Sequence, residues 1–200
     1  MAERDADLSD RVPPADSDWG SASGLTTLFD RHADAIHTYC FRRTASWQAA
    51  EDATATVFLE AWRGRVKLAS GDVSPLPWLY GIANNVCRNA TRSSHRRLRA
   101  LGRAPSEVSA PDHADGVADR VDSERQMAAV LAEISKLPRH EQDVFALVVW
   151  SGLTYDQTAT ALGVPVGTIR SRLSRTRRRL ASTLDHNRTD RPGSSEPDHA

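Results

Sequence analysis

Residues 153–180 read LTYDQTATALGVPVGTIRSRLSRTRRRL. Within this stretch Thr154 is followed three residues later by Gln157, which fits a capping box at the start of a short helix. Gly163 supplies a tight turn, and a longer basic helix begins at Pro165 or Val166. A short helix, a glycine turn and a long basic helix predict a helix-turn-helix, and a bare helical hairpin is the simpler alternative.

The long helix has an apolar side and a polar side. Ile169, Leu173 and Leu180 are spaced to point inward. The outward side carries hydroxyl and guanidinium groups: Thr168, Ser171, Arg172, Arg175 and Arg179. Because recognition helices place their N-terminal side chains on base edges in the major groove, we expect the first three of these to contact bases. Three further arginines flank this side and suit phosphate contacts: Arg170, Arg177 and Arg178.

The net charge of the chain is zero, but the charges are sorted into blocks. Residues 86–103 contain six arginines and no acid, and residues 166–180 contain another six and no acid. Between them, residues 104–126 hold six acids and two prolines. Two basic modules on an acidic tether indicate a polyanion partner, whereas one basic stripe alone fits a solvated helix face equally well. The use of arginine rather than lysine suits phosphate and guanine contacts, or reflects a GC-rich genome.

The segment from residue 24 to about 101 is predicted to form three helices. Apolar residues at helical spacing run from Leu25 to Cys40, a second helix spans about 48–65, and a third opens at Ser74 and Pro75. Strand signals are scarce, because β-branched pairs such as Val148-Val149 fall inside helical periods. The chain is therefore predicted to be all-α.

One face of the third helix alternates amide and guanidinium groups: Asn85, Arg88, Asn89, Arg92 and Arg96. Amides can hydrogen-bond exposed base edges and arginines can neutralise phosphates, so this face is a candidate contact surface for a nucleic-acid strand. Trp78 and Tyr80 near the start of the helix either stack on an unpaired base or pack in the core.

Several classes of function are excluded. No apolar run approaches the roughly 18 residues of a membrane span, and the acidic N-terminus lacks the apolar region of a signal peptide. Cys40 and Cys87 lie on apolar helix faces, which indicates core thiols rather than a disulfide framework or a zinc site. No nucleotide-binding or catalytic motif is present. We therefore expect a cytoplasmic protein that is not an enzyme and has no metal, cofactor or small-molecule substrate.

Three segments together resemble a bacterial RNA polymerase sigma factor. Residues 164–173 read VPVGTIRSRL and strongly resemble region 4 of the extracytoplasmic-function (ECF) group. Residues 50–63 read AEDATATVFLEAWR and resemble the region 2 helix that binds core polymerase. Residues 77–97 read PWLYGIANNVCRNATRSSHRR and resemble the promoter-melting part of region 2. The resemblance covers about three-quarters of the chain.

The resemblance implies two small helical domains, a region 2 helical bundle and a region 4 helix-turn-helix, joined by a flexible linker. On this sequence it implies a disordered acidic leader (1–23), region 2 (24–101), a linker (102–119), region 4 (120–184) and a disordered tail (185–200). The implied function is to bind core RNA polymerase, recognise the −35 and −10 elements of promoter DNA, and promote promoter melting and transcription initiation. An anti-sigma factor is a further partner that the family implies.

Site residues follow from the resemblance by position. The −35 element would be contacted by Thr168, Arg170, Ser171, Arg172, Arg175 and Arg179. The −10 strand would be contacted by Asn84, Asn85, Arg88, Asn89, Arg92 and Arg96, with the loop 66–76 shaping a pocket for a flipped base. Core polymerase would be contacted by Asp52, Glu60, Trp62 and Arg63.

The sequence departs from the family at two places. The family usually carries a polar Gln-Glu pair where this chain has Ala55 and Thr56, and an acid where it has Asn89. The first change leaves fewer polar contacts to polymerase. The alternative function is a helix-turn-helix regulator that acts without core polymerase, for which residues 153–180 alone would suffice but which has no need of residues 50–97.

Overall fold

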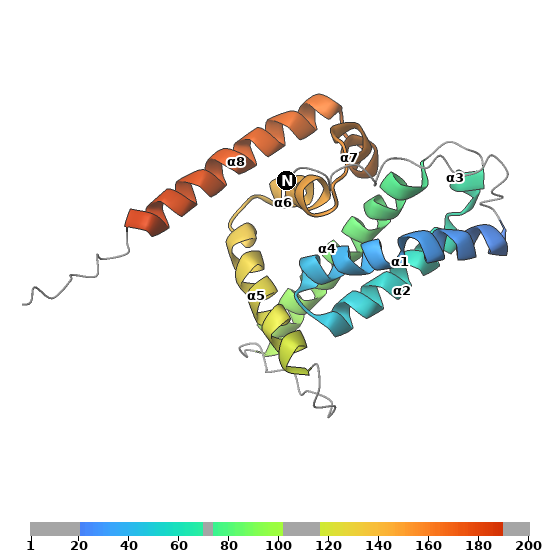
Figure 1. Ribbon diagram of the computed structural model, residues 1–200, viewed down its shortest axis with the longest axis horizontal. Coiled ribbons are helices and arrows are strands. Elements are labelled where there is room, and N and C mark those ends of the chain that lie inside the picture. Colours follow the sequence, from blue (N-terminus) through green and yellow to red (C-terminus); the bar gives the residue numbers. More distant parts are fainter. Residues whose placement is uncertain (1–20, 70–73, 102–116, 190–200) are drawn as a thin grey trace, which may run out of the picture.

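The computed structural model describes residues 21–69, 74–101 and 117–189, and every element in these ranges is a helix (Figure 1). No strand occurs in the described ranges, as the periodicity predicts. Most of the predicted leader, linker and tail lies outside them, as do residues 70–73 of the predicted base pocket. Among the described residues, no helix is long and apolar enough to cross a membrane.

The first module is built from three long helices. Helices α1 (Ala22–Thr44) and α2 (Trp47–Arg63) form a hairpin, and α4 (Pro75–Leu101) packs across both. The side chains of Ser21 and Ser46 cap the first two helices by accepting hydrogen bonds from backbone N–H groups. A short helix, α3 (Val66–Ala69), lies where the sequence predicted only a loop.

Apolar residues that recur at helical spacing on the three helices fill the core of this module. Fully buried members from the three helices include Ile36, Val57, Leu79 and Ala83. Cys40 and Cys87 are also fully buried, as the sequence predicted for core thiols. Their thiols form a hydrogen bond between α1 and α4, and this bond together with burial raises the pKa of the Cys87 thiol.

The second module contains the helix-turn-helix. It comprises α5 (Val117–Ser135), α6 (Arg139–Phe145), a π-helical segment η1 (Ala146–Trp150), α7 (Tyr155–Leu162) and α8 (Val166–Thr189). The chain turns between α7 and α8 at Gly163, whose φ of 63° is left-handed and favours glycine. The helix-turn-helix prediction is therefore confirmed.

The π-helical segment η1 was not predicted by the sequence. The backbone N–H of Ser151 donates to the carbonyl of Ala146, five residues earlier, at 3.2 Å. The wider turn brings Ala146 and Leu147 into the core while Val149 stays 53% exposed. The two adjacent valines that the sequence placed in a regular helix thus lie in a local bulge.

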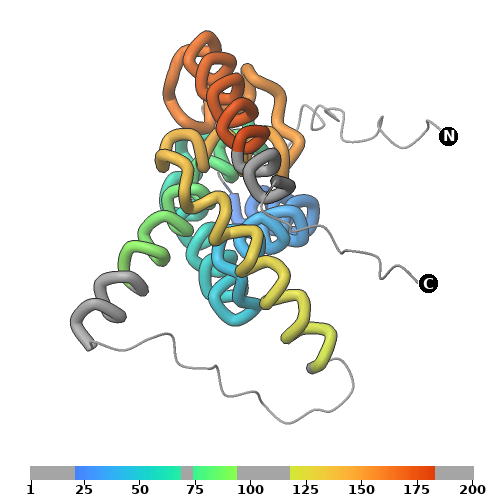
Figure 2. The backbone as a smooth tube through the Cα atoms, turned by 90° about the vertical axis from the view of Figure 1, so that its left-hand side faces the viewer, coloured from blue at the N-terminus to red at the C-terminus, as the bar shows by residue number. Residues whose placement is uncertain are grey.

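The two modules pack against each other in this structure. Helix α7 lies on α4, and η1 lies against α1 (Figures 1 and 2). Leu147 and Leu153 from the second module belong to the same buried cluster as Tyr39 and Tyr80 from the first. The structure therefore shows the two predicted helical modules in a closed arrangement, which the sequence did not predict.

The capping box at α7 provides a test of local stability. The Thr154 side chain accepts a hydrogen bond from the Gln157 N–H, and the Gln157 side chain accepts one from the Thr154 N–H. We expect Thr154→Ala to lower the free energy of unfolding by about 1 kcal/mol, because the backbone N–H of Gln157 loses its hydrogen-bond acceptor. Urea unfolding monitored by circular dichroism measures this loss. Thr160→Ala is the matched control, since Thr160 is exposed inside the same helix and caps nothing.

Candidate nucleic-acid interface

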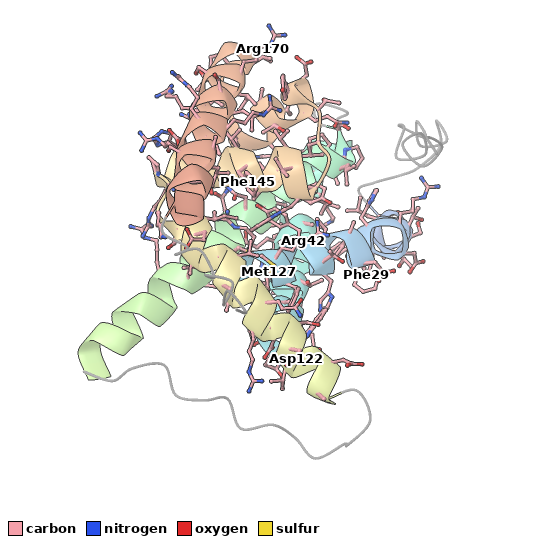
Figure 3. The ribbon with its side chains drawn as sticks, turned by 60° about the vertical axis from the view of Figure 1, so that its left-hand side comes forward. Phe29, Arg42, Asp122, Met127, Phe145 and Arg170 are labelled. Carbon is pink, nitrogen blue, oxygen red and sulfur yellow. The ribbon has the colours of Figure 1, made fainter. Side chains whose placement is uncertain are left out.

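Helix α8 presents the side chains that the sequence predicted to face DNA. Ile169 and Leu173 are buried, and they fix α8 against α6 and α7. Away from this buried stripe the predicted −35 contacts Arg170, Ser171 and Arg175 are exposed, while Thr168 and Arg172 on its flanks are partly exposed. Figure 3 shows Arg170 projecting away from the body at the end of α8 that follows the turn. This end of the helix is sterically open to a DNA groove.

The exposed face of α8 concentrates positive charge. The Arg175 guanidinium donates to the Ser171 carbonyl at 3.2 Å and to the Ser171 hydroxyl at 3.4 Å. A shallow hollow further along the helix is lined by Arg175, Arg178, Arg179 and Ser182. Arginines in such a row can neutralise phosphates of a nucleic-acid backbone.

Arg179 also has a structural contact that the sequence did not reveal. Its Nε lies 3.4 Å from Oε2 of Glu141, whose side chain is only 1% exposed. The pair links α8 to the first turn of α6, since a buried carboxylate needs a cationic neighbour. The sequence shows an acid near the start of α6, but nothing in its spacing identifies an arginine near the middle of α8 as the partner.

The predicted −10 face of α4 is exposed in part. Asn85, Asn89 and Arg92 are exposed, and Arg88 is partly exposed. The side chain of Arg96 lies outside the described residues. Trp78 is partly buried and Tyr80 is buried, and both pack with the core cluster.

Asn84 differs from the sequence expectation. Its side chain is 1% exposed and accepts a hydrogen bond of 3.0 Å from the hydroxyl of Tyr39. Burial raises the pKa of Tyr39 well above its usual value, so this hydroxyl stays protonated and able to donate. Asn84 faces α1 because it lies next to Ala83 and one turn before Cys87 on the inner stripe. A contact with DNA would require this hydrogen bond to break.

The predicted polymerase-binding residues lie on the outer side of α2. Asp52, Glu60 and Arg63 are exposed, and Trp62 is partly exposed beneath the Arg65 guanidinium, which lies 3.9 Å from its ring centre. Ala55 and Thr56, the positions that depart from the family, are also exposed. The outer side of α2 thus offers acidic, basic and aromatic groups together.

Sequence reasoning missed an apolar part of this surface. Leu59 is 49% exposed and Phe29 on α1 is 48% exposed. A shallow groove between the two helices is lined by Ala22, Leu25, Thr26, Phe58, Leu59 and Trp62. Figure 3 shows Phe29 at the far end of α1 from the second module. Exposed apolar side chains in one groove are typical of a protein-binding surface. The signal was available, because Leu59 falls off the buried stripe of α2.

Comparisons with known proteins identify both modules. The model of the family "Sigma-70 region 2" matches residues 28–97, and that of "Sigma-70, region 4" matches residues 127–180. The chain is 33% identical over 172 residues to RNA polymerase sigma factor HrpL of Pseudomonas syringae pv. syringae. This match covers 82% of this chain and 89% of HrpL. It is 31% identical over 167 residues to ECF RNA polymerase sigma factor SigM of Mycobacterium tuberculosis, covering 84% and 80% of the two chains. The chain belongs to the ECF sigma factors.

Solved structures agree with the fold of this sigma factor. CnrH, solved in complex with the cytosolic domain of CnrY, superposes with a TM-score of 0.61 at 22% identity, covering 86% of this chain and 94% of CnrH. RpoE of Bartonella quintana, solved with the anti-sigma factor NepR, superposes with a TM-score of 0.56 at 22% identity, covering 82% and 98%. Sigma factors are transcription initiation factors that act with core RNA polymerase. The alternative of a polymerase-independent regulator is not favoured, because the region 2 match accounts for the first module.

Proposed function

We propose that this sigma factor reads the −35 element with α8 and captures the −10 strand with α4, while α2 docks on core polymerase. The observation that carries the proposal is the pair of exposed polar faces, one on each module. The α8 face supplies hydroxyl and guanidinium groups at a helix N-terminus, which is the arrangement that reads the major groove. The α4 face supplies the partly exposed Arg88 together with the exposed Asn85, Asn89 and Arg92, which suit an unpaired strand.

The proposed domain limits are region 2 from 24 to 101, the linker from 102 to 119, and region 4 from 120 to 184. Helix α5 begins at Val117, so the last three linker positions are helical. The −35 contacts in the proposal are Thr168, Arg170, Ser171, Arg172, Arg175 and Arg179. Arg179 serves both to pair with Glu141 and to face phosphate, since its side chain is 56% exposed.

The proposed polymerase-binding surface comprises Asp52, Glu60, Trp62 and Arg63, and we add Leu59 to it. Leu59 lies one residue before Glu60 on the outer side of α2 and lines the apolar groove. Interfaces combine apolar anchors with a polar rim, and the groove with its surrounding charges has this composition. Apolar packing of Leu59 and Trp62 against polymerase compensates for the shorter, less polar side chains at Ala55 and Thr56.

The protein is an initiation factor without catalysis of its own, and it acts in the cytoplasm, where core polymerase and promoters are found. Among the described residues, no group of three His, Cys, Asp or Glu side chains is placed to hold a metal ion. RpoE was solved with the anti-sigma factor NepR and CnrH with the cytosolic domain of CnrY, and we extend an anti-sigma partner to this chain on that likeness.

Binding to polymerase is tested by size-exclusion chromatography of the full chain mixed with purified core enzyme. We expect the sigma factor to elute with core, and an excess of a second sigma factor to displace it. Separate elution at micromolar concentrations of both proteins would contradict the assignment of α2 as a docking surface.

The −10 assignment is tested with Asn85→Ala. We expect this variant to form closed complexes normally but to open promoters about tenfold more slowly, because the alanine side chain cannot hydrogen-bond an unstacked base. Permanganate reactivity of unpaired thymines over time measures opening. Thr91→Ala is the control, since Thr91 is also exposed on α4 but its hydroxyl bonds the Cys87 carbonyl. If Asn85→Ala formed open complexes equally slowly on a template whose −10 region is already unpaired, Asn85 would act in strand capture rather than in melting.

A further inference from the structure

Three charged side chains join the two regions at one point. The Asp143 carboxylate on α6 of region 4 lies 3.2 Å from the guanidinium of Arg43 on α1 and 3.5 Å from that of Arg88 on α4. The side chains of Asp143 and Arg43 are 7% and 9% exposed, whereas that of Arg88 is 41% exposed. An acid of region 4 is therefore held between two arginines of region 2, in a setting where solvent screens the charges weakly.

Further contacts close the same seam. The Arg42 guanidinium donates to the Trp150 carbonyl at 2.7 Å, and Arg43 donates to the Gln142 carbonyl at 3.5 Å. Figure 3 shows Arg42 where α1 meets the second module, below Phe145. Both bonds join α1 to the segment formed by α6 and η1. The seam is thus specific in geometry, since it uses a carboxylate and two backbone carbonyls against neighbouring arginines.

A glycine permits the close approach of α7 to α4. A methyl group at residue 81 would lie 2.8 Å from the carbonyl oxygen of Ala161, closer than such atoms approach in folded proteins. Gly81 lies in the second turn of α4, inside the helix, where alanine would favour the helix more than glycine does. Its presence there is explained by the packing of α7 and not by the needs of α4.

The closed arrangement cannot engage both promoter elements. Elements named for positions −35 and −10 lie about 25 base pairs apart, which is about 85 Å along B-form DNA. In the structure α7 touches α4, and α8 begins after a turn that spans at most about 14 Å. The reading end of α8 is therefore close to the strand-binding face of α4, and the regions must separate before both elements are bound.

We propose that the closed arrangement is a self-inhibited state, in which Asp143 of region 4 occupies Arg43 and Arg88 until the two regions separate. The proposal rests on the proposed function, because it takes Arg88 as a contact to the −10 strand. The carboxylate occupies Arg88 as a phosphate of that strand would, so strand and Asp143 compete for the same guanidinium. Separation of α6 from α1 and α4 frees Arg88 for the −10 strand and lets α8 move to the distant element.

The first test uses Gly81→Ala in the full chain, because the added methyl group would push α7 away from α4. Dyes attached at Thr38→Cys on α1 and Ser174→Cys on α8 report the separation of the regions by energy transfer, and both positions are exposed. The native thiols Cys40 and Cys87 are fully buried, so the dyes react at the introduced sites. We expect Gly81→Ala to lower energy transfer while leaving helix content unchanged. Gly167→Ala is the matched control, because a methyl group there meets no neighbour. Unchanged energy transfer in Gly81→Ala would overturn the proposal.

The second test measures binding of a random-sequence single-stranded DNA about 20 nucleotides long to the full chain without polymerase. We expect Asp143→Asn and Gly81→Ala each to bind about five- to tenfold more tightly than the unaltered chain, which is the lower part of the usual range of coupling between linked sites. Asp122→Asn is the control for charge alone, since Asp122 is exposed and pairs with Arg125 on its own helix, away from the contact between the two regions. If the unaltered chain, Asp143→Asn and Gly81→Ala bound this DNA with equal affinity, the proposed self-inhibition would be overturned. That outcome would not change transcription by the unaltered chain. Failure of the proposed self-inhibition can therefore be told apart from failure of the proposed sigma function.

Discussion

Leu59→Asp is expected to lower the affinity for core polymerase by about 30-fold or more. Leu59 is half exposed in the apolar groove between α1 and α2, beside Trp62. Central apolar anchors of protein interfaces typically contribute about 2 kcal/mol or more, and a carboxylate buried there without a partner adds a desolvation cost. The fold should tolerate the change, because the side chain already contacts water. Fluorescence titration of labelled core enzyme measures the dissociation constant.

Val66→Asp is the control for this variant. Val66 is 71% exposed on α3 of the same module, outside the groove. We expect Val66→Asp to bind core as the unaltered chain does. Equal affinity of Leu59→Asp and the unaltered chain would remove the groove from the docking surface and leave the charged residues of α2 to account for binding.

Arg172→Ala is expected to weaken discrimination between promoters by about 1–3 kcal/mol at one base pair of the −35 element. Arg172 lies in the second turn of α8, partly exposed, on the flank of the helix beside the buried stripe of Ile169 and Leu173. Its guanidinium is thus held on a rigid, well-packed helix, which is the condition for bidentate contact with a guanine. Binding of holoenzyme to a set of promoters with single base changes in the −35 element measures the effect.

Arg178→Ala provides the comparison for that experiment. Arg178 is exposed further along α8, where we expect a phosphate contact. Its loss should weaken binding to every promoter by a similar factor and reduce the salt dependence of binding. If Arg172→Ala gave this same uniform loss, its side chain would contact phosphate and not a base.

Local features of the fold were predictable from the sequence because short-range chemistry determines them. The capping box at Thr154 and the left-handed turn at Gly163 each depend on residues within a few positions. The buried stripes of α1, α2 and α4 follow from helical spacing in the same way. The recognition face of α8 was likewise readable, since the inward residues Ile169 and Leu173 determine which side faces out.

Features that depend on distant pairs were not predictable. Asp143 meets Arg43 across 100 positions, and no local pattern marks either as a partner of the other. Asn84 was assigned to the strand-binding face by its position in the family resemblance, but it lies at the boundary between two faces and its side chain turns inward to bond Tyr39. The sequence alone gives no reason for a glycine at position 81, and only the packing of α7 supplies one.

Run-off transcription tests the central claim most directly. Purified core polymerase is given sheared DNA from the source genome, with and without this sigma factor. Discrete transcripts that appear only with the protein, and that share −35 and −10 sequences upstream of their start sites, are the predicted result. Absence of new transcripts from core enzyme that responds to another sigma factor would contradict the account.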